Sequence, residues 1–159
     1  MFGGEADAQQ QRFLQIAQTC AGFNVRRVSR AVTQHFDLAL APLGLRATQF
    51  TLLGALVAAG PCSLGELAEG LLMDRTSLTR NVRPLMSRGL LQVGRGPDRR
   101  VRRVEITERG RQVVHEALPA WERAQAAIVT PLGQERWAGL VGELRNLAQI
   151  VQAQLPPAN

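Results

Sequence analysis

The sequence contains no lysine and no tyrosine, and it has only two cysteines and two histidines among its 159 residues. Two cysteines are too few for a disulfide scaffold. No apolar run reaches the ~18 residues that a membrane span requires, and the first residues lack the apolar segment of a signal peptide. These absences predict a cytoplasmic protein that has no membrane partner.

Residue patterns typical of catalysis or metal binding are missing as well. There is no glycine-rich phosphate loop and no Ser-His-Asp pattern. His35 and His115 do not combine with Cys20 or Cys62 at the spacing of metal ligands. We therefore expect no catalytic residue, no metal and no cofactor, and the chain is not predicted to be an enzyme.

The feature that the sequence has in abundance is arginine. All 19 basic side chains are arginines, and the formal net charge is +6. Of these arginines, 11 lie in residues 75–111, where the acids are only Asp98, Glu105 and Glu108. Clustered positive charge is typical of a protein with an anionic partner, above all nucleic acid.

Residues 74–89 predict a short helix with two different faces. Asp74 is a good N-cap, and Gly89 can adopt the left-handed conformation that ends many helices. Leu78, Val82 and Leu85 form an apolar stripe. The opposite side carries groups that can hydrogen-bond base edges and phosphates: Thr76, Ser77, Thr79, Arg80 and Arg83. The alternative is an amphipathic helix whose arginines are simply solvated.

The preceding segment predicts that this helix is the second of a pair. Ser63 and Glu66 can form a capping box, which would open a short helix through about Glu69. A tight connection then leads into the next helix. A short helix, a brief turn and a polar-faced second helix are typical of a helix-turn-helix motif, in which the second helix reads DNA.

The following segment predicts a β-hairpin. Residues 90–95 and 100–106 alternate between apolar and polar side chains, with a turn between them. The tip carries Asp98, Arg99 and Arg100. A guanidinium at such a tip can enter the narrow minor groove of A·T-rich DNA, where negative potential is concentrated. A basic hairpin directly after a helix-turn-helix is a wing.

Both ends of the chain are predicted to be helical because apolar residues recur every three or four positions. One long helix is expected from Arg12 to about Leu40, a second over about 48–59, and two more over about 108–130 and 134–154. We expect the end helices of two chains to pack together in a homodimer. Two-fold symmetry would then place the two reading helices ~34 Å apart, in successive major grooves, on double-stranded DNA with an inverted-repeat site.

The predicted fold is mostly α with a small β-wing: a winged helix-turn-helix domain plus a helical dimerisation region. The expected organisation is a flexible N-terminus (1–10), an N-terminal dimerisation helix (11–44), a DNA-binding domain (45–107), C-terminal dimerisation helices (108–154) and a tail (155–159). Pro119 lies inside one predicted helix and should kink it.

The sequence resembles the MarR family of winged helix-turn-helix transcriptional regulators. The wing signature of that family is Asp, any residue, Arg, five residues, Leu, Thr. Asp98, Arg100, Ile106 and Thr107 occur at this spacing, with Ile in place of Leu. Three upstream stretches also follow the family pattern in order and spacing: residues 65–68, 74–80 and 87–90.

The resemblance implies a homodimeric repressor that inserts Arg100 into the minor groove, with Asp98 steadying the wing tip. It also implies that five side chains face the major groove or its phosphates: Thr76, Ser77, Thr79, Arg80 and Arg83. Pro84 departs from the pattern, because it removes a backbone hydrogen bond to Arg80 inside the helix. A bend in the last helical turn is therefore expected.

The resemblance further implies a small aromatic acid as effector, because many members of the family release DNA when such a ligand binds between the dimer region and the winged domain. The candidate residues for this site are Cys20, Phe23, Arg27, His35 and Arg46. An arginine in such a pocket could pair with a carboxylate.

Cys20 has two interpretations that stay open. One branch of the family senses organic hydroperoxides through a cysteine in its first helix, which would make the chain a thiol-based repressor. The residues around Cys20 do not closely match that branch, and no tyrosine is available to stabilise a thiolate. The other interpretation is a small buried apolar side chain. An alternative from a different functional class is that the chain is not a DNA-binding regulator but a helical protein–protein interaction module with a basic face.

Overall fold

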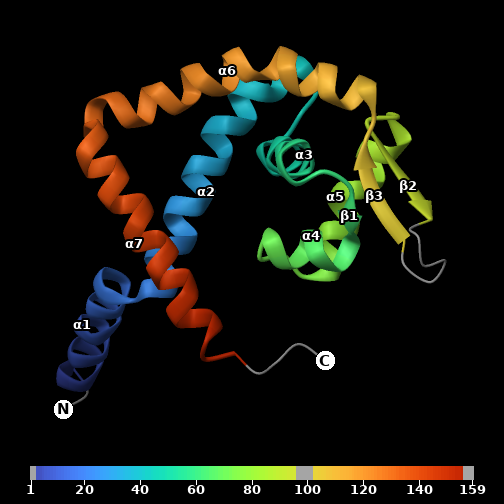
Figure 1. Cartoon of the computed structure of the whole chain (residues 1–159). Helices are drawn as coiled ribbons and strands as arrows, with labels where there is room; N and C mark the ends of the chain where they lie inside the picture. The colour runs from blue at the N-terminus through green and yellow to red at the C-terminus, as the bar shows by residue number, and fades with distance from the viewer. Residues whose placement is uncertain (1–2, 96–101, 156–159) are drawn as a thin grey trace. The chain divides into compact units, whose positions relative to one another are not determined.

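A computed structural model describes residues 3–95 and 102–155 of the chain, with side chains over 7–94 and 102–155. The chain divides into two compact units, Met1–Leu118 and Pro119–Asn159 (Figure 1). The first unit contains every described element up to β3 and also the part of helix α6 that precedes Pro119. The architecture is mostly helical with a small sheet, as the sequence predicts, and the sheet has three strands.

The N-terminal region consists of two helices, α1 (Gly3–Thr19) and α2 (Ala21–Leu40), so the prediction of one uninterrupted helix from Arg12 is wrong. The break is at Cys20, which has an extended conformation with ψ of 115°. The side-chain amide of Asn24 donates to the carbonyl oxygens of Cys20 at 3.0 Å and Ala17 at 3.3 Å. A side chain thus satisfies carbonyls at the break, which apolar periodicity cannot reveal.

Helix α1 also begins earlier than expected. Residues 1–10 are predicted to be flexible, whereas the helix already begins at Gly3. This segment is rich in Ala, Glu and Gln, which have high intrinsic helix propensity. The prediction relied on an apolar stripe, and this part of the helix does not have one.

The connection from α2 to α3 (Ala47–Ala59) is a short 3₁₀ helix, η1 (Ala41–Leu43), that ends in Gly44 with φ of 65°. Asp37 Oδ1 accepts a hydrogen bond from the backbone N–H of Ala47 at 2.6 Å. This carboxylate satisfies one of the free amides at the start of α3. The buried leucines of α3 are Leu52, Leu53 and Leu56.

The predicted helix-turn-helix is confirmed as α4 (Leu64–Gly70) and α5 (Arg75–Ser87). Ser63 and Glu66 form the expected capping box, with Glu66 N–H donating to Ser63 Oγ at 3.1 Å and Ser63 N–H donating to Glu66 Oε2 at 2.6 Å. Asp74 is the N-cap of α5, and Gly89 has the left-handed φ of 69°. The helix continues past Pro84 to Ser87.

The wing is confirmed by strands β2 (Leu91–Arg95) and β3 (Arg102–Ile106), which are antiparallel, with Val93 opposite Val104. A third strand, β1 (Cys62–Ser63), pairs with the other edge of β3 and was not predicted. Two residues are too few for an alternating pattern. The expected hairpin tip, including the start of the second strand at residue 100, lies outside the described residues.

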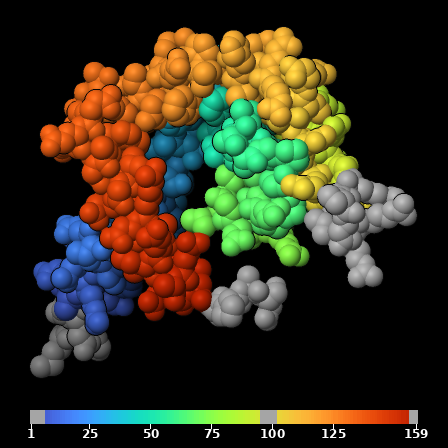
Figure 2. All heavy atoms as spheres, in the orientation of Figure 1, coloured from blue at the N-terminus to red at the C-terminus, as the bar shows by residue number. Residues whose placement is uncertain are grey.

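The core of the first unit lies between α3, α5 and the sheet. Leu78, Val82 and Leu85 of α5 are at most 4% exposed, as their stripe predicts. They meet α3 on one side and β2 on another. Burying one face of α5 in this way leaves its opposite face in solvent. In Figure 2, the green atoms of the helix-turn-helix region lie at the surface, beside the yellow atoms of the hairpin.

The wing strands are anchored where α6 (Glu108–Leu132) begins. Thr107 N–H donates to Leu90 O at 3.1 Å, and its hydroxyl donates to Gly89 O at 2.7 Å. The same hydroxyl oxygen accepts from Gly110 N–H at 3.0 Å, so Thr107 caps this helix. One threonine therefore joins the end of the recognition helix to the start of α6.

The second unit consists of the rest of α6, which is continuous through Pro119, and α7 (Gln134–Gln152). Gly133, with φ of 89°, separates the two helices. Large apolar side chains of this unit are exposed, including Leu140, Leu144 and Ile150.

Over the described residues, no single helix is long and apolar enough to cross a membrane. Helix α2 with η1 passes the same test only together with α3, and this pair is bent by 77°.

Candidate nucleic-acid interface

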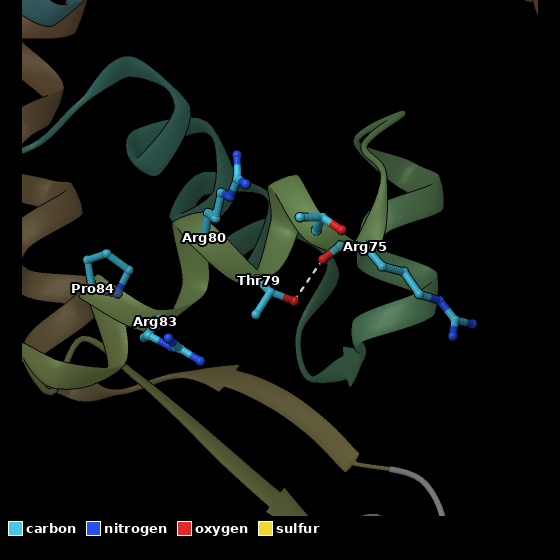
Figure 3. Close-up of a pocket in the computed structure, with 6 residues that line it drawn as sticks. Arg75, Thr79, Arg80, Arg83 and Pro84 are labelled. Atoms are coloured by element: carbon cyan, nitrogen blue, oxygen red, sulfur yellow. Dashed lines mark hydrogen bonds between the residues drawn. The ribbon is translucent and has the colours of Figure 1, made fainter.

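The solvent face of α5 is the candidate site. Asp74 caps the helix and the apolar stripe fixes its rotation, so the polar residues between the stripe positions point outward. They line an open hollow of about 480 Å³ (Figure 3), formed by Arg75, Thr76, Thr79, Arg80, Arg83 and Pro84. We call the first five of these residues the arginine face. Figure 3 shows the three guanidiniums fanning out from the helix.

The hydroxyl groups of this helix differ in what they can still bind. Thr79 Oγ1 donates to Arg75 O at 2.7 Å, so its oxygen lone pairs can still accept a hydrogen bond (Figure 3). Ser77 Oγ donates to Asp74 Oδ2 at 2.6 Å, and Ser77 N–H donates to Asp74 Oδ1 at 2.8 Å. Ser77 is half-buried and is not among the residues that line the hollow. The structure therefore places Ser77 in the helix cap.

Two further arginines, which were not selected from the sequence, also lie at this surface. Arg75 is exposed at the first position of α5 and lines the same hollow as Arg80 and Arg83. Arg102 is exposed on β3 and lines two neighbouring hollows, in each of them together with Thr79. The position of Arg75, one turn before Thr79, was a usable signal. The position of Arg102 was not, because only the packing of the hairpin against α5 brings it there.

Alternation along β3 separates Arg102 from its neighbour. Arg103 is half-buried, and one of its terminal nitrogens donates to the carbonyl oxygen of Pro61. Its Nε is buried without a hydrogen-bond partner. Arg103 therefore connects β3 with the segment leading into β1, whereas Arg102 is free to extend towards a ligand of the arginine face.

The carboxylates nearest this surface are occupied in helix caps. Hydrogen bonds from the Ser77 hydroxyl and backbone lower the pKa of Asp74 below its ordinary value. Hydrogen bonds from Ser63 likewise lower the pKa of Glu66. Both groups stay ionised at neutral pH, and each accepts from amides at a helix N-terminus, where negative charge is favourable.

The wing-tip residues Asp98, Arg99 and Arg100 lie outside the described residues. Their place in a DNA complex therefore stays a prediction. The strands that carry the tip are described, and their register, with Arg95 opposite Arg102, fixes where the hairpin leaves the sheet.

Only one of the five effector candidates lines the hollow beside the start of α3. Arg46 lines a hollow of about 610 Å³ together with Arg30 and Asp37, at the junction of α2, η1 and the residues before α3. The other four candidates do not line this hollow: Cys20, Phe23, Arg27 and His35. Arg30 was not selected from the sequence; it lies one helical turn before Gln34, which also lines the hollow. Over the described residues, no three acidic, His or Cys side chains gather as a metal site requires.

The helix-turn-helix, its basic outer face and the hairpin behind it define a winged helix-turn-helix protein that binds DNA. The sequence model of the MarR family matches residues 43–103, which span α3 to the wing. A search of curated proteins gave no match.

Solved structures of transcriptional regulators match almost the whole chain. The regulator MosR of Mycobacterium tuberculosis, in complex with DNA, is 34% identical, with a TM-score of 0.79 over 86% of this chain and 99% of MosR. BpsR of Bordetella bronchiseptica is 28% identical, with a TM-score of 0.74 over 82% and 94% of the two chains. The repressor CouR, bound to a DNA duplex, is 26% identical, with a TM-score of 0.76 over 84% and 95%.

The chain belongs to the MarR family of transcriptional regulators. This membership confirms the family resemblance of the sequence and the predicted fold class.

Proposed function

We propose that this protein is a homodimeric, sequence-specific DNA-binding repressor whose affinity for an inverted-repeat site is lowered by a small aromatic or anionic effector. The observation that carries the proposal is the arginine face. Its three guanidiniums and two hydroxyls lie on one exposed side of a helix that is capped at one end and buried on the other side. Guanidiniums bind guanine edges and phosphates in paired hydrogen bonds, as a recognition helix requires.

The relatives support this reading of the arginine face. MosR was crystallised in complex with DNA, and CouR is described as a transcriptional repressor bound to a 23-mer DNA duplex. In this chain, Thr76, Thr79, Arg80 and Arg83 would face the major groove. At the wing, Arg99 and Arg100 would approach the minor groove with Asp98 steadying the tip. Arg75 and Arg102 would contact phosphates at the margins.

The homodimer is supported by apolar side chains that each unit leaves in solvent. On α1, Phe13 is 63% exposed and Leu14 58%, and on α2, Val28 is 61% exposed. On α7, Leu144 and Ile150 are about half exposed, at 47% and 53%. Large apolar side chains left in solvent on several helices are what a subunit interface would cover. We therefore assign DNA binding to residues 45–107 and dimerisation to residues 11–44 and 108–154.

An anionic effector is supported by the hollow that Arg30 and Arg46 line. Two guanidiniums beside apolar Leu38 and Leu45 suit a planar carboxylate with an aromatic body. Among the relatives, the DNA binding of BpsR is regulated by 6-hydroxynicotinic acid. Phe23, Arg27 and His35 remain candidates for the same function.

The second candidate, regulation through Cys20, is favoured by one observation. Cys20 is a half-buried free cysteine at the break between α1 and α2. Oxidation of its thiol would therefore change the junction between these two helices. Release of DNA after peroxide, and its absence in Cys20→Ser, would favour this candidate over a ligand.

The decisive experiment is selection of DNA by the full-length chain from a random-sequence library, followed by affinity measurement at ~150 mM salt, where phosphate attraction alone is weak. We expect an enriched inverted repeat that binds far more tightly than a scrambled duplex. Equal binding of both duplexes contradicts the proposal. Thermal shift and DNA release with simple aromatic acids, beside peroxide treatment, then separate the two regulatory candidates.

A further inference from the structure

The C-terminal end of the recognition helix is held by an arginine that lies away from the arginine face. Arg88 is the C-cap of α5, and its Nη1 donates to Gly44 O at 2.6 Å. Its Nη2 lies 3.5 Å from Leu43 O. Arg88 is half-buried, and it is not among the residues that line the three hollows around Thr79.

The two acceptors are suited to a guanidinium. Leu43 and Gly44 lie at the C-terminal end of η1, where carbonyl groups lack helical partners and carry partial negative charge. Gly44 has φ of 65°, and a Cβ added there would lie 3.5 Å from Arg88 Nη2. One planar, permanently charged group can donate to both carbonyls, which an ammonium cannot do with the same geometry.

A second hydrogen bond attaches the middle of α5 to the first turn of α3, just after this connection. Thr48, at the start of α3, donates from Oγ1 to Asn81 Oδ1 at 3.0 Å. The amide nitrogen of Asn81 in turn donates to Ser77 O at 2.9 Å. The start of α3 therefore holds α5 at Asn81 and the α2–α3 connection holds it at Arg88, about two helical turns apart.

On α5 itself, Asn81 and Arg88 are half-buried, while the arginine face is exposed. A helix held at two points about two turns apart cannot swing at its C-terminal end without breaking one of them. Groups that read base edges must be held in place by supporting contacts, because small displacements lose directional hydrogen bonds. Attraction to phosphates depends much less on geometry.

We propose that Arg88 is a positioning residue for sequence reading: through the carbonyl oxygens of Gly44 and Leu43, it fixes the C-terminal end of α5 so that Arg80 and Arg83 meet their bases in register. The proposal rests on the sequence-specific function proposed above. It makes Arg88 distinct from the arginines of the arginine face, since it acts through backbone carbonyls of its own chain.

The test uses the full-length chain, the duplex it selects from a random library and a scrambled duplex. Arg88→Met should weaken binding of the selected duplex about tenfold, as expected when one charge-assisted hydrogen bond is lost. Binding of the scrambled duplex and the salt dependence of affinity should not change. Arg88→Lys should recover part of the loss, because its ammonium can still donate to one carbonyl.

Two comparison variants make the outcome decisive. Arg75→Met, at an exposed arginine proposed above to contact a phosphate, should lower the slope of log affinity against log salt by about one. Arg26→Met, which removes a charge from an exposed arginine of α2, should leave selective binding unchanged. A fall in slope for Arg88→Met equal to that of Arg75→Met would overturn the proposal, as would unchanged selectivity.

If Arg88→Met does not fold, Thr48→Val provides the second test, because it removes the other attachment with little change in volume. It should reduce the ratio of selected to scrambled binding without changing the salt slope. An unchanged ratio would overturn the positioning role. Failure of the unmodified chain to select any sequence would instead contradict the proposed function, so the two failures are distinguishable.

Discussion

Arg80 lies on the exposed side of α5, in the middle of the arginine face, where a side chain can reach base edges. We expect Arg80→Ala to weaken binding and to relax base preference by about 1–3 kcal/mol at the bases it reads. Arg100→Ala should weaken binding to all sequences alike. The measurement is affinity for a panel of single-base variants of the selected duplex. Equal, sequence-independent losses in both variants would contradict this division of roles.

Asp74 connects the sequence to the stability of the reading helix through its charge. Its pKa is lowered in the folded chain by hydrogen bonds from Ser77, so its ionised form stabilises the fold. This contribution is fully present above the unfolded pKa of about 3.9, and it is lost as the pH falls further, through the lower folded value.

The corresponding experiment compares the wild-type chain with Asp74→Asn by urea unfolding between pH 7 and pH 3. Asparagine is also a good N-cap, so the comparison isolates the charge. The wild type should be the more stable at neutral pH, and the difference should shrink below about pH 4. A difference that is the same at both ends of the range would show that the charge of Asp74 does not contribute.

At the scale of elements, the start of α6 packs closely against the residues that link α5 to the wing strands. Gly110 is buried, and a Cβ at this position would lie 2.2 Å from Leu90 O and 2.7 Å from Ile106 Cγ1. Neither neighbour is a flexible side-chain end, because one is backbone and the other belongs to the buried core. Only glycine allows the helix to begin here.

Gly110→Ala should therefore destabilise the first unit by about 1–3 kcal/mol, as overpacking does. Gly54→Ala is the matched control, since Gly54 also lies inside a helix but has nothing within 4 Å of an added Cβ. The control should be neutral or stabilise by up to ~1 kcal/mol. Thermal unfolding measures both variants, and equal effects would contradict the role assigned to the contact.

Other features of the elements were readable from local sequence. The capping box of Ser63 and Glu66, the N-cap Asp74 and the left-handed Gly89 all act on backbone groups within a few residues. Such short-range chemistry is the part of a fold that residue order records directly. The break between α1 and α2 at Cys20 was not predicted, because it depends on the side chain of Asn24 and not on the apolar period.

At the scale of the whole molecule, the proposed dimer follows from apolar surface that neither unit buries by itself. Phe13 and Ile16 of α1 are 63% and 46% exposed. We expect Phe13→Ser with Ile16→Ser to shift the chain from dimer towards monomer in sedimentation experiments. Binding to an inverted repeat should fall more than binding to a single half-site, since two linked reading helices bind with avidity.

Leu72→Ser is the control, because Leu72 is 59% exposed but lies in the turn between α4 and α5. It should leave the sedimentation coefficient unchanged. A wild-type chain that sediments as a monomer at micromolar concentration would remove the basis for the inverted-repeat site.

The sequence alone determined the helix-turn-helix, the hairpin and the excess of arginine, because caps, apolar periods and charge are properties of neighbouring residues. It placed Thr76, Thr79, Arg80 and Arg83 on one face for the same reason, and the hollow along α5 brings these four together.

Only the tertiary structure decided which distant residues share that surface or support it. Packing of the hairpin brings Arg102 to hollows that Thr79 also lines, and Arg88 donates to Gly44 O across 44 positions of the chain. Strand β1 exists only because the edge of β3 offers it hydrogen bonds. These contacts depend on how buried faces pack in three dimensions, and no local pattern of residues encodes the partner.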